Sequence, residues 1–118
     1  MQAELVYLHS PDTEDLRHYM PKDPSHFGIL VQAMVRPQGE QGEESFDFFV
    51  CTPSWLTDQL RRKESVFGRG YLFLIRYDYD LLFKAIKWIC SQVQGADWLT
   101  IAGQLGQYGK WEFDDYEQ

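Results

Sequence analysis

The chain has 118 residues, of which 44% are hydrophobic and 16% aromatic, and its formal net charge at pH 7 is −7. A chain of this size buries roughly two-thirds of the surface that its unfolded form exposes, so we expect one domain, residues 1–118, with its own hydrophobic core. The acidic charge disfavours binding to nucleic acid or to an anionic membrane, because both require a basic face.

Three strand patterns stand in the first half of the chain. In the third, Phe46, Phe48 and Val50 fall on one face at a period of two residues. The segment Gln38–Glu44 contains two glycines and is typical of a hairpin loop, which makes the second and third strands an antiparallel pair. The predicted strands are Glu4–Leu8, Gly28–Arg36 and Glu44–Cys51.

The segment between the first two strands is polar, acidic and interrupted by three prolines. Because proline breaks regular structure, the segment has room for one helical turn, at Asp12–Tyr19. We expect Asp12 to cap this turn, with Leu16 and Tyr19 facing inward.

A helix-start signal follows the third strand directly. Thr52 stands where an N-cap hydroxyl is expected, and Pro53 takes the first helical position, where its missing N–H is tolerated. The helix is predicted over Pro53–Arg62, with an apolar stripe formed by Trp55, Leu56 and Leu60.

The strongest helical pattern in the chain is Asp80–Gln94. Its apolar residues recur at helical spacing, and Trp88 is expected to widen the buried stripe. Either Asp78 or Asp80 caps the helix, and Gly95 ends it.

The remaining pattern predicts a strand at Tyr71–Tyr77, a helix that opens at Asp97 and ends near Gly106, and a final strand at Lys110–Phe113. Trp98, on the apolar side of the second helix, is expected in the core. Because most strands precede the helices, the sequence predicts an α+β fold, with a mainly antiparallel sheet and two to three helices packed on one face.

No constellation of catalytic or metal-binding residues stands out. The spacing of His9, His18 and His26 matches no zinc site, and neither a phosphate-binding loop nor a nucleophile elbow occurs. Serines near acids or histidines in sequence do not make a triad, which is defined by geometry, and Ser54 fits a polar position in the first turn of a helix. We therefore expect no catalytic residue, no metal and no cofactor, with a carboxylate-dependent enzyme as an alternative.

The two cysteines, Cys51 and Cys90, lie in apolar patterns, where buried free thiols are favoured over a disulfide. The N-terminus lacks the basic and apolar pattern of a secretion signal, and no apolar stretch is long enough to cross a bilayer. We therefore expect a cytoplasmic protein without membrane association.

Acidic side chains gather in three groups that no lysine or arginine interrupts. Such groups are either simple charge patterning on loops and a tail, or an acidic surface that meets a cationic cleft. Tyr19, Tyr108 and Tyr116 lie beside acidic or loop segments and could anchor an interface, although Tyr19 and Tyr108 fit the edge of the core equally well. The groups are Asp12, Glu14 and Asp15; Glu40, Glu43, Glu44 and Asp47; and Glu112, Asp114, Asp115 and Glu117.

The strand–Thr–Pro–x–Trp–Leu junction that ends at Leu56 resembles the core signature of the eighth bacterial immunity-protein family, whose members neutralise toxins delivered between competing bacteria. The similarity covers nearly the whole chain, and the order and spacing of its pieces carry it, rather than any one piece. The further matching pieces are Leu8-His9-Ser10-Pro11-Asp12, Phe27-Gly28, Gly95-x-x-Trp98 and Trp111-Glu112-Phe113-Asp114-Asp115-Tyr116.

This resemblance implies an inhibitor, from contact-dependent or polymorphic toxin systems, that binds one cognate toxin domain one-to-one and has no catalysis of its own. The acidic charge points to a basic nuclease, with a ribonuclease as the best guess, whose cleft is covered by acidic loops. The matched junction residues are expected to be architectural, and an acidic oligomeric adaptor is a further alternative. The candidate toxin contacts are Asp12, Glu14, Asp15, Tyr19, Glu40, Glu43, Glu44, Asp114, Asp115 and Tyr116.

Overall fold

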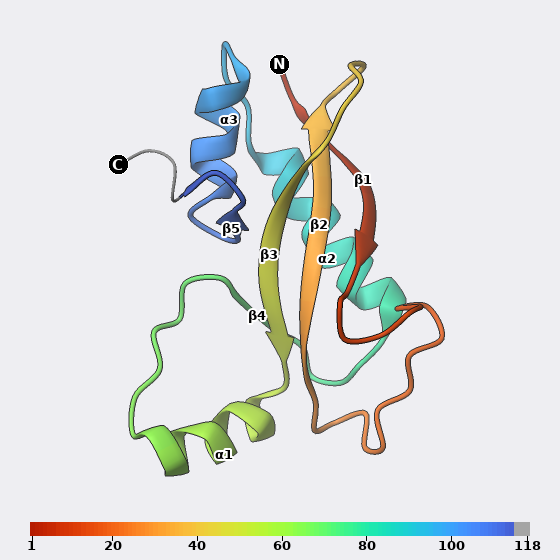
Figure 1. Ribbon diagram of the computed structural model, residues 1–118, viewed down its shortest axis with the longest axis vertical. Coiled ribbons are helices and arrows are strands. Elements are labelled where there is room, and N and C mark those ends of the chain that lie inside the picture. The colour runs from red at the N-terminus through yellow and green to blue at the C-terminus, as the bar shows by residue number, and fades with distance from the viewer. Residues whose placement is uncertain (115–118) are drawn as a thin grey trace.

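Residues 1–114 are the part of the chain that the structure, a computed structural model, describes, and they form a five-stranded sheet with three helices (Figure 1). The sheet is mostly antiparallel, so the predicted α+β fold is confirmed. The elements are β1 (Ala3–His9), β2 (Gly28–Pro37), β3 (Glu44–Cys51), α1 (Pro53–Lys63), β4 (Tyr71–Phe73), α2 (Tyr79–Gln92), α3 (Trp98–Leu105) and β5 (Lys110–Trp111).

Strands β1, β2 and β3 form an antiparallel meander, and the free edge of β3 is shared by two short strands. Strand β4 pairs in parallel with the last residues of β3, from Phe49 to Cys51. Strand β5 pairs antiparallel with Phe46 and Asp47, nearer the start of β3. Segments far apart in the sequence therefore meet along one strand edge.

A bulge in β1 adapts this strand to the core. The register moves from Leu5 opposite Val35 to Tyr7 opposite Met34, so one extra residue is accommodated between them. In a regular strand, residues three positions apart point to opposite faces of the sheet. Because of the bulge, Leu5 and Leu8 instead both pair with core-facing residues of β2, Val35 and Ala33. Both leucines therefore pack toward the core, while Tyr7 is exposed on the opposite face.

The hydrophobic core lies between one face of the sheet and the helices α2 and α3, and α2 passes behind β1 and β2 in Figure 1. Phe46 and Val50 of β3 are almost completely buried there. They meet Leu82 and Ile86 from α2 and Ile101 from α3. The alternating apolar residues from which β3 was predicted therefore do form the face of the strand that packs in the core.

Helix α1 lies beyond the end of β3 (Figure 1) and contributes no buried residue, so its predicted apolar stripe is only partly covered. Leu60 at the end of that stripe is exposed. Trp55 packs against Phe49 with ring centroids 4.7 Å apart. Because Phe49 alternates with the core residues of β3, Trp55 covers the face of the sheet opposite α2.

Helix α2 corrects one expectation about the core. Asp78 caps the helix, since its carboxylate accepts a hydrogen bond from the backbone N–H of Leu81 at 3.2 Å. The helix ends at Gln92, before the predicted Gly95, because Val93 turns into an extended conformation and is buried. Trp88 was expected in the core but is 60% exposed, because the stripe that α2 buries is too narrow to include it.

Three further predicted elements differ from the structure. The strand expected over Tyr71–Tyr77 is confined to β4, because β3 ends at Cys51 and offers no partner beyond Phe73. Asp12–Tyr19 contains turns and bends instead of a helical turn, although Leu16 and Tyr19 do face inward as expected. Likewise, the predicted last strand, Lys110–Phe113, is limited to the two residues of β5.

Candidate functional site

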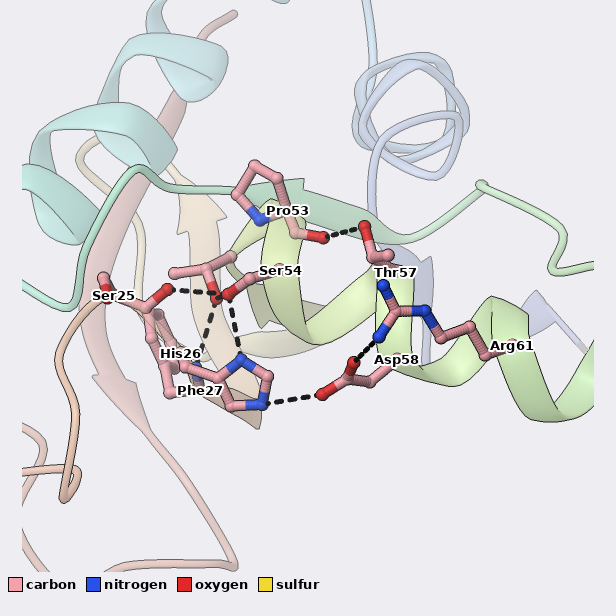
Figure 2. A network of polar contacts seen from close by, with 9 residues as sticks. Ser25, His26, Phe27, Pro53, Ser54, Thr57, Asp58 and Arg61 are labelled. Atoms are coloured by element: carbon pink, nitrogen blue, oxygen red, sulfur yellow. Dashed lines mark hydrogen bonds and ion pairs between the residues drawn. The ribbon is translucent and has the colours of Figure 1, made fainter.

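The segment before β2 is clasped to the start of α1 by hydrogen bonds in both directions (Figure 2). The backbone N–H of Phe27 donates to Thr52 Oγ1 at 3.2 Å, and the backbone N–H of Thr52 donates to the carbonyl of Phe27 at 3.1 Å. Ser54 Oγ donates to the carbonyl of Ser25 at 2.9 Å. The Thr52 hydroxyl was expected to cap α1, but it makes no cap hydrogen bond and instead holds the neighbouring segment.

Gly28 is the point where this clasp requires the absence of a side chain. A Cβ atom at Gly28 would stand 2.5 Å from Cε2 of Trp55, closer than non-bonded carbon atoms approach. The indole therefore lies directly on the backbone of β2. The Phe27-Gly28 and Thr52-Pro53-x-Trp55 pieces of the sequence consequently form one structural unit.

The clasp also brings a histidine that precedes β2 beside a serine and an aspartate from the first turns of α1 (Figure 2). His26 Nδ1 lies 2.9 Å from Ser54 Oγ, and His26 Nε2 lies 3.3 Å from Asp58 Oδ2. In hydrolase triads the serine faces Nε2 and the aspartate faces Nδ1, so the ring is reversed here. The Ser54 hydroxyl also donates to the carbonyl of Ser25, and Asp58 accepts from Arg61 at 3.3 Å. These contacts fit a structural clasp better than an activated nucleophile.

A second clasp is centred on Glu44 at the start of β3. The indole N–H groups of Trp98 and Trp111 donate to its two oxygens at 2.9 and 2.7 Å. Next to it, Glu112 Oε1 accepts a hydrogen bond from the backbone N–H of Ser45 at 2.6 Å. Glu44 was a candidate contact, but its carboxylate is occupied in joining β3 to α3 and β5.

Asp12 is occupied in a similar way at the end of β1. Its backbone N–H donates to Ser10 Oγ at 3.0 Å, and its carboxylate accepts from the backbone N–H of Leu30 at 3.0 Å. The last pair between β1 and β2 joins His9 to Gln32. The Asp12 side chain thus supplies an acceptor to β2 just beyond the place where β1 stops.

The other members of the first acidic group differ in how far they are engaged. Asp15 accepts from the backbone N–H of Arg17 and lies 2.6 Å from His18 Nδ1, and the hydrogen bond with His18 lowers the pKa of Asp15. Glu14 is exposed and has no hydrogen-bond or ion-pair partner within residues 1–114. The Tyr19 ring packs edge-on against Tyr77 with centroids 4.9 Å apart, and partial burial raises the pKa of Tyr19.

The β2–β3 hairpin carries the most accessible carboxylates of the second group. Glu40 and Glu43 are both exposed. Glu43 accepts a hydrogen bond from the Tyr7 hydroxyl at 3.2 Å, which raises the pKa of Tyr7. In the part of the chain that the structure describes, the Glu40 carboxylate has no partner. The hairpin projects at one end of the molecule (Figure 1).

The third acidic group is described only in part, because Asp115 and Tyr116 lie outside residues 1–114. Asp114 forms an ion pair with Arg69 at 2.6 Å. The same guanidinium donates to the carbonyl of Gly106 at 2.6 and 2.9 Å. Asp114 is therefore paired within the protein.

The acidic loops at residues 12–15 and 40–44 lie at opposite ends of β2. Asp12 binds Leu30 near its start, whereas the backbone N–H of Glu40 donates to the carbonyl of Pro37 at its end. At about 3.3 Å per residue these two points are about 23 Å apart along the strand. The acidic residues therefore do not form one compact patch, and Figure 1 shows the two loops at opposite ends of the sheet.

A groove that the sequence did not reveal lies on the sheet face opposite α2. It has a volume of about 310 Å³. Asp47 lines this groove, and its Oδ1 atom is buried and has no hydrogen-bond partner among the described residues. The feature of the sequence that could have indicated this groove is Asp47, an acidic residue in the middle of an aromatic strand. The groove is lined by Leu30, Asp47, Phe49, Arg69, Gly70, Tyr71 and Lys110.

A second, apolar groove of about 440 Å³ lies between α2, β4 and the segment after α3. Trp88 and Tyr108 form its exposed walls, and Lys84 is its one charged lining residue. Tyr108 thus lies on the surface beside apolar residues. An apolar surface of this kind is suited to contact with another protein.

The thiols and the potential metal ligands offer no reactive centre in the part of the chain described. Cys51 and Cys90 are buried and free, as the sequence predicted, and burial raises the pKa of each thiol to about 11. Within residues 1–114 no group of three or more histidine, cysteine, aspartate or glutamate residues is placed to hold a metal ion. Among the same residues, no helix is long and apolar enough to pass through a membrane.

Comparison with known proteins finds a matching family model. Neither the curated proteins nor the solved structures contain a match to this chain. The family model described as Immunity protein 8 matches residues 3–116 and so includes both clasps and the acidic loops. The chain therefore belongs to the Immunity protein 8 family.

Proposed function

We propose that this protein binds one cognate antibacterial toxin domain, one-to-one, and neutralises it in the cytoplasm of the cell that carries it. Membership of an immunity-protein family supports this role. The proposal needs no catalytic group, metal or cofactor in the inhibitor, because occupying or covering the toxin's active cleft is sufficient.

The observation that carries the proposed mode of binding is the division between engaged and accessible carboxylates. Asp12 and Glu44 are occupied within the fold. Glu14, Glu40 and Glu43 are exposed on loops at the two ends of the sheet. We therefore assign the leading toxin contacts to the hairpin and the first loop, and the engaged acids to the framework that supports them.

The charge of the protein favours a toxin with a basic cleft. At a net charge of −7, the protein attracts a cationic partner and repels nucleic acid. A nuclease must present cationic groups to bind phosphates. Carboxylates at the mouth of its cleft would compete with the nucleic acid for these groups, so a nuclease, with a ribonuclease as the best guess, is the proposed target.

Calorimetric titration of the purified protein into the polypeptide encoded directly upstream of it tests the proposed binding. We expect a one-to-one complex, with an interface of about 1,200–2,000 Å² in total. A folded protein that gives no binding heat and does not co-purify with that polypeptide would contradict the proposed function.

Stopped-flow association with paired variants tests the acidic contacts separately. The double variant Glu40→Gln/Glu43→Gln is expected to associate more slowly and with a weaker dependence on salt, because long-range attraction accelerates the encounter. The control Glu64→Gln/Asp80→Asn removes the same charge from two exposed positions outside the hairpin. Equal rates for both double variants would contradict a role of the hairpin.

The apolar groove beside Trp88 and Tyr108 favours a second candidate function, that of an oligomeric adaptor. Exposed aromatic surface of this kind supports self-association. Sizing chromatography of the wild type and of Trp88→Gln separates the two functions. A monomer at all concentrations excludes the adaptor, whereas an oligomer that dissociates in the variant supports it.

A further inference from the structure

We infer that the groove around Asp47 is a socket for an arginine side chain of the cognate toxin. This inference rests on the proposed function and deepens it, because it assigns a central contact to a sheet face that the acidic loops do not include. The loops would guide the encounter, and the socket would hold the complex together.

Asp47 supplies the first observation. It lies in the middle of β3, opposite Gln32 of β2 and Lys110 of β5. Its Oδ1 atom is buried and lacks a hydrogen-bond donor among the described residues. Native proteins rarely leave a buried acceptor unsatisfied, and such departures concentrate at functional sites. The Asp47 carboxylate therefore retains an unsatisfied acceptor, at a residue that lines the groove, which a donor from a binding partner could satisfy.

The walls of the groove fit a guanidinium group. Phe49 and Tyr71 lie beside Asp47 with ring centroids 5.6 Å apart, and Leu30 completes the apolar lining. A guanidinium is planar, stacks on aromatic faces, and offers a fork of N–H donors to a carboxylate. Cation–π contact with the rings and charge-assisted hydrogen bonds to Asp47 can thus form at the same time.

The face that carries the groove is open to a partner. Helices α2 and α3 cover the other face of the sheet (Figure 1). Within residues 1–114, Trp55 of α1 packs on the groove-bearing face at Phe49. The protein is acidic overall, with a net charge of −7, so long-range attraction also favours a cationic guest.

Two cationic side chains, Arg69 and Lys110, also line the groove, and neither donates a hydrogen bond to Asp47 Oδ1. Arg69 is bound to Gly106 and Asp114. The Lys110 side chain runs along Gly70 and forms no ion pair within the described part of the chain. Lys110 is therefore a competitor of the incoming arginine. If the groove instead held an anion, Lys110 would be required, and this difference separates the two occupants.

The experiment compares Asp47→Asn, Lys110→Gln and Asp80→Asn in calorimetric titrations with the polypeptide encoded directly upstream. Asp80→Asn is the matched control, since it removes the same charge from an exposed position on α2. We expect Asp47→Asn to lower the association constant at least about tenfold, as loss of a buried charge partner does, without lowering the melting temperature. Lys110→Gln is expected to bind as tightly as the wild type or more tightly.

Two results would overturn the inference while leaving the proposed function intact. The first is wild-type affinity in Asp47→Asn. The second is a loss of affinity in Lys110→Gln, which would indicate an anionic occupant.

A titration with L-arginine amide, followed by NMR, tests the socket without the toxin. Shifts at the backbone amides of Phe49, Gly70 and Tyr71 that L-citrulline amide does not produce would support it. The absence of such shifts would overturn the socket even if Asp47→Asn fails to fold. If the wild type shows these shifts but does not bind the toxin, the proposed function is contradicted, whereas binding of an arginine side chain in the groove is still supported.

Discussion

The indole of Trp55 lies against the backbone of Gly28, so closely that a Cβ atom there would stand 2.5 Å from Cε2 of the ring. This contact joins the start of α1 to the start of β2. Together with the hydrogen bonds between Phe27 and Thr52, it turns two separate pieces of the sequence into one corner of the fold. Phe27, Gly28, Thr52 and Trp55 therefore contribute to the architecture of this corner.

Replacing Gly28 with alanine is expected to destabilise the protein by about 1–3 kcal/mol, because the added methyl group forces the indole away from the strand. Urea denaturation, monitored by tryptophan fluorescence, measures the free energy of unfolding. The companion Trp55→Ala removes the ring, so the double variant Gly28→Ala/Trp55→Ala should be more stable than the sum of the single effects predicts. Strict additivity would show that the two residues do not interact.

Glu44→Gln is expected to destabilise the protein by about 1–3 kcal/mol, because an amide has one acceptor oxygen and leaves one of the two indoles without its partner. The indole N–H resonances of Trp98 and Trp111 in NMR spectra should shift. Glu43→Gln is the matched control, since this neighbouring carboxylate is exposed and, within residues 1–114, accepts a hydrogen bond only from the Tyr7 hydroxyl. An equally small effect of both variants would contradict the clasp.

Stability at low pH should depend on Asp97, which caps α3. Its carboxylate accepts from the backbone N–H of Thr100 at 2.9 Å, and hydrogen bonds from that backbone group and from the Thr100 side chain lower the pKa of Asp97 below its usual 3.8. The lowered pKa means that the ionised carboxylate stabilises the folded state. This contribution is complete above the unfolded pKa and is lost as the pH falls through the folded pKa.

Urea denaturation of the wild type and of Asp97→Asn, from about pH 6 down to about pH 3, measures this effect. Asparagine still caps a helix but does not titrate in this range, so the variant should lose less stability on acidification than the wild type. Parallel pH profiles for the two proteins would contradict the assignment.

Both thiols should be inert in the folded protein. Burial raises the pKa of Cys51 and of Cys90 to about 11, and only a thiolate attacks a disulfide reagent. A colorimetric thiol assay near neutral pH is expected to label neither cysteine in the native state and both in urea. Rapid labelling of one thiol in the native protein would show that its surroundings open to solvent.

The sequence predicted best the elements whose periodicity comes from their own residues. Strands β2 and β3 and helices α2 and α3 have a core face that recurs regularly, and all four were identified. Strand β4 was predicted too long, because its length depends on where β3 ends at Cys51. The prediction that Trp88 is buried was wrong. Helical periodicity shows which residues lie on the same side of a helix, but it does not show how much of that side the sheet covers.

The candidate site was harder to predict, since a sequence shows charge without showing partners. Glu44 stands in an acidic run of the sequence, and the sequence does not show that its oxygens accept from two indoles far along the chain. His26 and Asp58 meet only because the clasp folds their segments together. The unsatisfied oxygen of Asp47 likewise appears only when all three neighbouring strands are in place.

Titration of the toxin's activity with this protein is the most direct test of the proposed inhibition. The polypeptide encoded directly upstream is assayed on its own substrate while the wild-type protein is added in steps. For a tight one-to-one inhibitor, we expect the activity to fall linearly and to disappear at one molar equivalent. Full activity in the presence of excess folded protein would contradict it.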